Sequence, residues 1–328
     1  MKIYFTDCEG PISLNDNAQE LAEFFIPNGA DSFAKISKYD DYLADIEKKP
    51  GYMPGMTLRL ILPFLKAYGA TDKKIQKYCA ENVALVPGAR KTLTYIYNLM
   101  PIHIISTSYE YYVRAVCDEI GIDMRYASCT NLSLDAFNIN PRELISLKNI
   151  YSEISDMPII DLPDGAELFE DLSTQTKISI VRLNNIFWRE IAKMASSDMY
   201  LNKTVIGGKK KANIIIKKAK SLGIELPNVM YVGDSITDAQ ALKIAGISVS
   251  FNGNHYAIES SDIAVISKNT LVMRDLAMAF KKNGKDTVLD LVDSLESAHI
   301  ITSENKFELI EKSLAMRKKI RGKAGALG

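Results

Sequence analysis

The chain opens with a short apolar segment that stops abruptly at acidic residues, and this feature restricts its possible folds most. Residues 3–5 are isoleucine, tyrosine and phenylalanine, and a glycine–proline pair ends the segment MKIYFTDCEGP. A run this short that is apolar on both faces is typical of a strand inside a parallel sheet. Ligands bind beyond the carboxyl ends of such strands, which makes Asp7 a candidate for chemistry. Taken alone, Asp7 is more simply explained as an acidic turn after a strand.

A second stretch of the same kind lies far downstream, at residues 229–242. Its sequence, VMYVGDSITDAQAL, contains an apolar strand, then Asp234, and then Asp238 where a helix begins. Either aspartate alone could cap the free N–H groups of that helix. If the two strands are neighbours, Asp7, Asp234 and Asp238 form an all-oxygen cluster suited to Mg²⁺. Without a cation, a cluster of uncompensated acids would push at least one pKa upward.

Together with two further motifs, these stretches resemble the haloacid dehalogenase-like (HAD) superfamily, and most closely its phosphoserine phosphatase-like branch. The family's four ordered motifs are matched by IYFTDCEG, IHIISTSY, GGKKKANIIIKKAKSLG and VMYVGDSITD. Their order and spacing agree from Met1 to about Ala279. The resemblance implies an α/β fold: a doubly wound parallel-sheet HAD-like core with a helical cap domain and a second helical insertion.

The same resemblance implies roles for the residues in these motifs. Asp7 is expected to attack phosphorus, and Glu9, at the position of the family's second Asp, to act as general acid and base. Mg²⁺ would be bound by Asp7, by the main-chain carbonyl of Glu9, and by Asp234 and Asp238. The expected substrate-binding residues are Gly10, Thr107, Ser108 and Arg59.

Ser106 and Lys211 complete the expected catalytic set, although both motifs allow a plainer interpretation. Ser106 ends an apolar strand and could donate its hydroxyl and N–H to a phosphoryl oxygen, but a Ser-Thr-Ser turn is also a common helix cap. Three lysines follow Gly208, and two of them suit a solvated basic tip. We take Lys211 as the family's lysine, with Lys210 as the fallback, because a lysine there would bind phosphate and offset the carboxylates.

The chain divides into segments of different pattern. Between residues 14 and 86 the pattern is helical, is interrupted by glycine and proline, and resembles the four-helix (type C1) cap of HAD enzymes. Arg59 falls close to that family's substrate-binding arginine, although an arginine on a solvated helix face explains it equally well. The predicted segments are a HAD-like core at 1–13, 87–125 and 205–280, a cap at 14–86, an accessory insertion at 126–204 and a C-terminal helical extension at 281–328.

The insertion at residues 126–204 contains expected helices where phosphoserine phosphatases have only a short strand pair. Phe187 and the sole tryptophan, Trp188, could form a docking surface for a protein partner, although an aromatic pair on a helix is more often core. The C-terminal helices are a second candidate contact for a protein partner. The basic end of the chain, KKIRGKAGALG, is expected to be a frayed tail.

Composition narrows the range of partners. The 328 residues carry equal numbers of acidic and basic side chains, which gives no electrostatic reason to expect nucleic acid or a membrane surface as partner. We expect no membrane span and no secretory leader, because no apolar run approaches the ~18 residues that cross a bilayer. The four cysteines lack CxxC spacing and suit reduced thiols, which predicts a cytoplasmic protein.

These observations predict a Mg²⁺-dependent phosphomonoester hydrolase that acts on a small phosphorylated metabolite through an aspartyl-phosphate intermediate. Glu9, Pro11 and Thr237 depart from the family's commoner residues, and Pro11 and Thr237 argue against phosphoserine itself as the substrate. Two alternatives stay open. The chain also resembles archaeal HAD-like proteins labelled as a subunit of energy-converting hydrogenase, which would imply a regulatory or non-catalytic subunit. The other alternative is transfer of the phosphoryl group to an acceptor alcohol.

Overall fold

The computed structural model describes residues 1–163, 165–201, 203–322 and 325. The chain forms two compact units, each built from separate segments of the sequence. The sheet unit contains residues 1–16, 80–130 and 206–328, and the helical unit contains residues 17–79 and 131–205. The regions that the sequence assigned to a cap and to an accessory insertion thus supply the two segments of one unit. The C-terminal extension belongs to the sheet unit.

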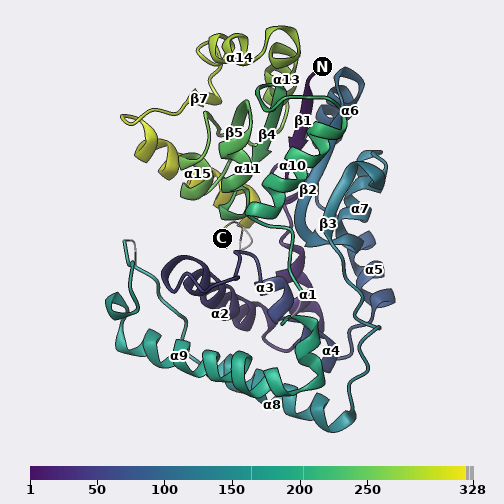
Figure 1. Ribbon diagram of the computed structural model, residues 1–328, viewed down its shortest axis with the longest axis vertical. Coiled ribbons are helices and arrows are strands. Elements are labelled where there is room, and N and C mark those ends of the chain that lie inside the picture. The colour runs from purple at the N-terminus through teal and green to yellow at the C-terminus, as the bar shows by residue number, and fades with distance from the viewer. Residues whose placement is uncertain (164, 202, 323–324, 326–328) are drawn as a thin grey trace. The chain divides into compact units, whose positions relative to one another are not determined.

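A seven-stranded sheet forms the centre of the sheet unit. Every pair of neighbouring strands is parallel except the last, which is antiparallel. In spatial order the strands are β3 (Ala127–Thr130), β2 (Ile102–Tyr109), β1 (Ile3–Thr6), β4 (Val229–Gly233), β5 (Ile247–Phe251), β6 (Ile263–Val265) and β7 (Ala298–Ile300). The mostly parallel sheet with its helices confirms the predicted α/β class (Figure 1).

The helices of the sheet unit are α6 (Ala89–Leu99), α7 (Glu110–Ile120), α10 (Lys209–Ser221), α11 (Ala239–Ile244), α12 (His255–Glu259), α13 (Val272–Asn283), α14 (Lys285–Val292) and α15 (Lys306–Arg321). They cover both faces of the sheet. Ile3 and Phe5 of β1 pack in an apolar cluster with side chains of α10 and α11, which lie side by side (Figure 1). Tyr4 and Thr6 instead face a small cavity lined by residues of α6 and α13. Because both faces are buried, the strand carries apolar side chains on both faces instead of alternating with polar ones.

Two strands differ from the sequence-based expectation. The strand predicted to end at Ser106 continues as β2 to Tyr109, so the Ser-Thr-Ser sequence belongs to the strand and is not a helix cap. Its register against β3 shifts between Ile105 and Tyr109, which leaves the end of the strand irregular. β7 lies in a region where only helices were expected, and three residues are too few to give a periodic signal.

The helical unit consists of α1 (Asn17–Phe25), α2 (Gly29–Asp41), α3 (Thr57–Leu60), α4 (Leu62–Ala67), most of α5 (Asp72–Glu81), α8 (Pro141–Asp156) and α9 (Thr174–Asn185). Aromatic side chains join its two segments. Tyr39 of α2 stacks on Phe187 with ring centroids 5.8 Å apart, and its hydroxyl accepts a 2.7 Å hydrogen bond from Nε1 of Trp188. Phe187 is fully buried, so the structure places it in the core and not on a docking surface.

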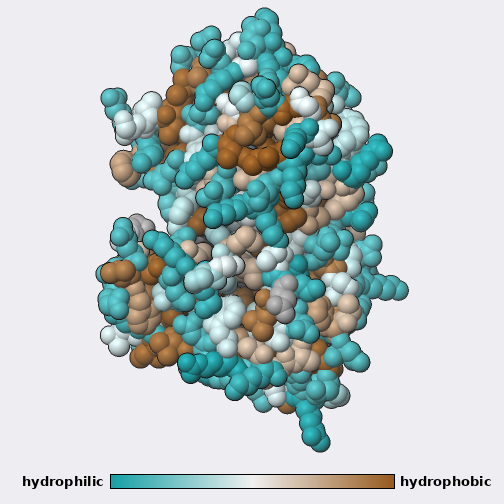
Figure 2. All heavy atoms as spheres, viewed as in Figure 1, coloured by the Kyte–Doolittle hydropathy of each residue, from teal (hydrophilic) through white to brown (hydrophobic). Residues whose placement is uncertain are grey.

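The surface shown in Figure 2 is mixed in character: apolar side chains lie in separate groups between hydrophilic ones. Among the described residues, no helix combines the length and the apolar character that a membrane crossing requires. All four cysteines are buried, and none is in a disulfide.

Candidate active site

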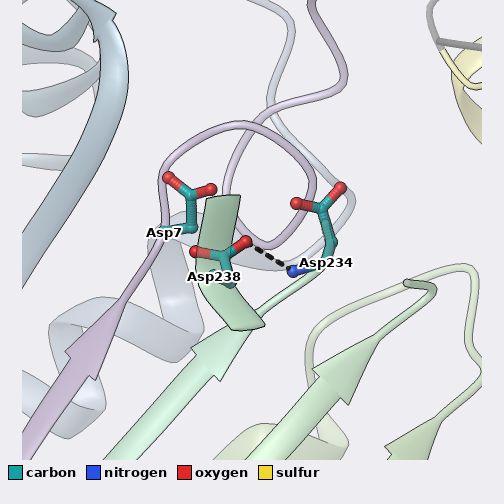
Figure 3. Close-up of side chains that lie close together, drawn as sticks. All are labelled: Asp7, Asp234 and Asp238. Atoms are coloured by element: carbon teal, nitrogen blue, oxygen red, sulfur yellow. Dashed lines mark hydrogen bonds between the residues drawn. The ribbon is translucent and has the colours of Figure 1, made fainter. Parts of the chain in front are cut away.

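Two neighbouring strands deliver carboxylates to the same edge of the sheet. β1 ends at Thr6 and Asp7 follows it, with the Asp7 N–H donating to the carbonyl of Val232 in β4 at 2.8 Å. Asp234 directly follows β4, and Asp238 lies in the short 3-10 turn after it. Figure 3 shows the three aspartates grouped beyond the ends of these two strands. Adjacent parallel strands therefore explain why residues far apart in sequence meet here.

The three carboxylates lie close enough together to bind one ion. Asp7, Asp234 and Asp238 each offer an oxygen, and these oxygens all lie within 4.8 Å of one another. All three residues are buried. A donor set made only of carboxylate oxygens suits a hard divalent cation such as Mg²⁺. The donor chemistry of the cluster therefore fits the metal that the sequence analysis expected.

Lys211 bridges two of these carboxylates. Its Nζ lies 2.7 Å from an oxygen of Asp7 and 2.7 Å from an oxygen of Asp238. α10 begins two residues earlier, and its first turn leaves Lys209 exposed and Lys210 half-buried while Lys211 is fully buried. The structure thus brings Lys211 to the carboxylates.

Burial and neighbouring charges together set the protonation of Asp7 and Lys211. Burial raises the pKa of Asp7 well above its usual range, Asp238 and Asp234 raise it further, and Lys211 opposes them. For Lys211, burial by itself would lower the pKa, but attraction to Asp238 and Asp7 outweighs it and leaves the pKa raised. Lys211 therefore keeps its positive charge beside Asp7 at neutral pH.

Asp238 acts mainly as the anchor of this arrangement. Its Oδ1 accepts a 2.5 Å hydrogen bond from the hydroxyl of Tyr231 in addition to that from Lys211, and its Oδ2 accepts one of 3.0 Å from the N–H of Asp234. Burial would raise the pKa of Asp238, but Lys211 and these hydrogen bonds lower it below its usual range. The sequence analysis did not single out Tyr231, although a buried tyrosine in an aliphatic strand usually has a hydroxyl partner.

Gly10 lies against the carboxylate of Asp234. Its φ is +94°, which side chains other than glycine rarely adopt, and a Cβ built there would lie 2.2 Å from Oδ2 of Asp234. The loop after β1 can therefore approach β4 this closely only with glycine at this position. The Gly10 N–H donates a 2.8 Å hydrogen bond to the carbonyl of Ser13, and this bond closes the loop.

The end of β2 brings hydroxyl groups to the same edge of the sheet. Thr6 pairs with Ile104, so Ser106 lies level with the loop that follows Asp7. The Ser106 hydroxyl accepts a 3.1 Å hydrogen bond from the N–H of Ser108. The hydroxyl oxygen of Thr107 is buried and has no hydrogen-bond partner among the described residues. These hydroxyls supply hydrogen-bonding groups beside the carboxylates.

Glu9 and Arg59 complete the set of residues that the sequence analysis named. Glu9 is half-buried in the loop after Asp7, where its main chain bridges to Ser13. Arg59 lies in α3 of the helical unit, and its guanidinium donates to the carbonyls of Asn131 (3.1 Å) and Thr204 (3.4 Å). The roles expected for Glu9 and Arg59 stay predictions.

Two arginines that the sequence analysis missed also reach the site. Arg317 and Arg321 of α15 both donate to Oδ2 of Asp234, Arg321 at 3.1 Å. The expectation of a frayed basic end is wrong for Arg321, whose side chain is only 5% exposed. Residues 323, 324 and 326–328 of that predicted tail lie outside the described residues.

The charges of the cluster are consequently balanced. Lys211 pairs with Asp7 and Asp238, while Arg317 and Arg321 pair with Asp234. Lys211 offsets the carboxylates as the sequence analysis expected, and the two arginines add compensation that it did not expect. Sequence periodicity offered one signal for the arginines, since they lie four residues apart and so share one face of a helix.

The fold and the arrangement of this site define the class of protein. A family model described as haloacid dehalogenase-like hydrolase matches residues 134–271, which include Lys211, Asp234 and Asp238. This part of the chain is therefore similar to haloacid dehalogenase-like hydrolases, and most of the chain shares the fold of phosphoserine phosphatases.

Individual solved structures are similar over most of the chain. A gene product of Archaeoglobus fulgidus is 28% identical, with a TM-score of 0.85, and the match covers 100% of this chain and 99% of that one. A substrate-bound phosphoserine phosphatase shares the fold at 18% identity and a TM-score of 0.50, with 84% of this chain and 97% of that one covered. An apo phosphoserine phosphatase is 17% identical with a TM-score of 0.50, and the match covers 87% of this chain and 99% of that one. No curated protein matches the sequence.

Proposed function

We propose that the protein hydrolyses a phosphate monoester of a small metabolite, with Asp7 as nucleophile and Mg²⁺ as cofactor. One observation carries this proposal: the Asp7 carboxylate lies between two groups that favour its ionised form. Oδ1 accepts a 2.7 Å hydrogen bond from the N–H of Cys8, and Oδ2 lies 2.7 Å from Nζ of Lys211. These contacts orient the carboxylate and oppose the effect of burial on its pKa.

The proposed reaction has two steps. An oxygen of Asp7 attacks phosphorus and forms an aspartyl-phosphate, while the ester P–O bond breaks and the alcohol leaves with a proton from Glu9. A water molecule then attacks the same phosphorus, gives its proton to Glu9, and releases inorganic phosphate, which restores the Asp7 carboxylate. Glu9 is half-buried, as a group that exchanges protons with substrate and water should be.

Other side chains of the sheet unit would hold the transferred phosphoryl group. Lys211 is positively charged and bound to Asp7, so it can neutralise a phosphoryl oxygen placed there. Ser106 and Thr107 lie in the last part of β2, at the same edge of the sheet, and the Thr107 hydroxyl has no partner among the described residues. A phosphoryl oxygen would supply the acceptor that this buried hydroxyl lacks.

Asp7, Asp234 and the main-chain carbonyl of Glu9 would hold Mg²⁺, with Asp238 orienting them. When bound, the cation would neutralise charge on the phosphoryl oxygens. Oδ2 of Asp234 is hydrogen-bonded to two arginines in this structure. A cation at Asp234 would therefore share this carboxylate with both guanidinium groups or displace them.

The test is hydrolysis of p-nitrophenyl phosphate and of a panel of small phosphomonoesters in the presence of Mg²⁺. We expect Asp7→Asn to lower turnover by at least about 10³-fold, because the amide is not a nucleophile. Asp275→Asn is the matched control, since it makes the same chemical change on an exposed position of α13. A phosphate adduct on residues 1–11, found by mass spectrometry after rapid quenching, would identify the intermediate. Turnover by Asp7→Asn at the wild-type rate would rule the proposal out.

A second candidate function is a regulatory or non-catalytic subunit. The balanced charges of the cluster favour it, because the carboxylates need no bound cation in this arrangement. Absence of turnover across the panel, together with a stable complex recovered from cells, would support this alternative. Addition of acceptor alcohols to the assay tests for phosphotransfer, which would appear as a phosphorylated alcohol.

A further inference from the structure

α15 docks on the sheet unit through one stripe of side chains. Leu309, Ser313, Arg317 and Arg321 are spaced four residues apart, so they share one face of the helix. Leu309 packs in an apolar cluster with Ile258 and Ala264. The three following positions of the stripe are polar, and they run from that cluster toward the carboxylate of Asp234.

These polar positions bind the loops that form the candidate active site. The Ser313 hydroxyl donates to the carbonyl of Gly253 at 2.7 Å. Arg317 donates to both the main-chain carbonyl and the carboxylate of Asp234. Arg321 donates to that carboxylate and also to the carbonyls of Leu14 (3.1 Å) and Asn15 (2.6 Å), in the segment that leads out of the loop after β1.

The arginines bind the carboxylate that a divalent cation would also use. Oδ2 of Asp234 is the acceptor for both guanidinium groups, and Asp234 is one of the three candidate ligands. A guanidinium has no free electron pair and cannot join the coordination shell of a metal. It would also repel a second cation within a few ångströms in a buried site. The docked arginines therefore oppose the binding of a cation at Asp234.

Few apolar side chains hold the rest of α15. Among the described residues, Leu309 is its one buried apolar side chain and Ile310 packs half-buried against the same cluster, whereas Phe307 is 71% exposed and Leu314 40% exposed. The hold on the helix consequently depends on the polar contacts of Ser313, Arg317 and Arg321 with the site itself.

We propose that α15 is an autoinhibitory strap, in which Arg317 and Arg321 occupy the carboxylate that the metal requires. Docking of α15 then weakens cation binding at Asp234, and cation binding at Asp234 favours release of α15. Release of the strap would open the site to a divalent cation and so switch on the phosphatase. The inference rests on the proposed function, because it names how that same site is regulated.

The test measures cation binding and does not require turnover. Binding of Mn²⁺ is followed by electron paramagnetic resonance of the free ion in wild type and in Arg317→Gln/Arg321→Gln. We expect the double variant to bind about tenfold more tightly or better, because its site no longer has to displace the strap. Lys318→Gln/Lys319→Gln is the matched control, since it removes the same charge from exposed positions of the same helix, and it should bind like wild type. Equal affinity in the double variant and wild type would overturn the inference.

Two further measurements keep the test decisive if the double variant folds poorly. Ser313→Ala keeps both arginines but loses the hydrogen bond to Gly253, so it should also bind Mn²⁺ more tightly, by a smaller factor. In wild type, saturating Mn²⁺ should increase amide hydrogen exchange in residues 306–321, and unchanged exchange there would contradict the strap. Failure of the proposed function would appear separately, as absence of phosphomonoester turnover in wild type and double variant alike, whatever their Mn²⁺ affinities.

Discussion

At the scale of single residues, the site depends on how closely two loops approach each other. Gly10 allows the loop after β1 to lie against Asp234, where a Cβ would fall 2.2 Å from Oδ2. The carboxylate of Asp234 could not move aside easily, because Asp234 is only 2% exposed and its side chain is paired with Arg317 and Arg321. The contact therefore couples the geometry of the nucleophile's loop to that of the second aspartate.

Replacement of Gly10 by alanine should show this coupling as a loss of stability. Gly121 is the matched control, because its φ is +74° and an added Cβ would meet nothing within 4 Å. Gly121→Ala should cost roughly 1–2 kcal/mol for its backbone conformation alone. Gly10→Ala should cost roughly 1–3 kcal/mol more, from overpacking against Asp234. Thermal melting followed by circular dichroism compares the two, and equal losses would mean that the close contact is unimportant.

The sequence could locate some residues of the site but not others. Asp7 and Asp234 were accessible because each follows an apolar strand, and the ends of adjacent parallel strands meet at one edge of the sheet. To identify Lys211, the residue at which α10 begins had to be known, and the run of three lysines left Lys210 and Lys211 as candidates. Arg317 and Arg321 could not be assigned, because their contact with Asp234 spans more than eighty residues and depends on how α15 docks.

At the scale of secondary structure elements, α15 shows why a familiar pattern can mislead. Its apolar residues Phe307 and Leu314 are exposed, while Ser313 and Arg317 are buried. A search for an apolar stripe therefore finds no buried face, and the helix looks like a solvated end of the chain. The buried stripe is polar because it faces carbonyl groups and a carboxylate, which only the three-dimensional arrangement reveals.

The helical unit follows the usual rule that an aromatic pair on a helix is core. Phe187 is stacked on Tyr39 and lies 6.1 Å from the ring of Phe64, so it joins residues from both segments of the unit. Phe187→Ala should therefore lower the free energy of unfolding of this unit by about 3–5 kcal/mol. Fluorescence of Trp188, the sole tryptophan, reports the transition in urea because it belongs to the same unit.

Ile178→Ala provides the control for this prediction, since Ile178 lies on α9 of the same unit but is 60% exposed. Its loss should change the free energy of unfolding by no more than about 0.5 kcal/mol. Comparable effects of the two substitutions would show that the aromatic contacts do not hold the two segments together.

At the scale of the whole molecule, the chain has two units, and the stability of each unit can depend on pH in its own way. The sheet unit contains the balanced cluster of carboxylates and cations, whereas the described residues of the helical unit include one buried acid, Asp40. Its Oδ1 accepts a 2.6 Å hydrogen bond from the hydroxyl of Tyr52, and its Oδ2 accepts one of 2.9 Å from the N–H of Gly55. Asp40 thereby fixes the glycine- and proline-rich loop that follows α2.

Burial raises the pKa of Asp40 to about 7, despite these hydrogen bonds. Because the folded state holds the proton more tightly than the unfolded state, this contribution to stability is complete at acidic pH and is lost as pH rises through about 7. The fluorescence-detected free energy of unfolding should thus fall between pH 5 and pH 7, by up to about 1.4 kcal/mol per pH unit. Asp40→Asn cannot titrate, so its curve should be flatter over this range even if the variant is less stable throughout. Parallel curves for the two proteins would mean that Asp40 is ionised in the folded unit and that another group sets its response to pH.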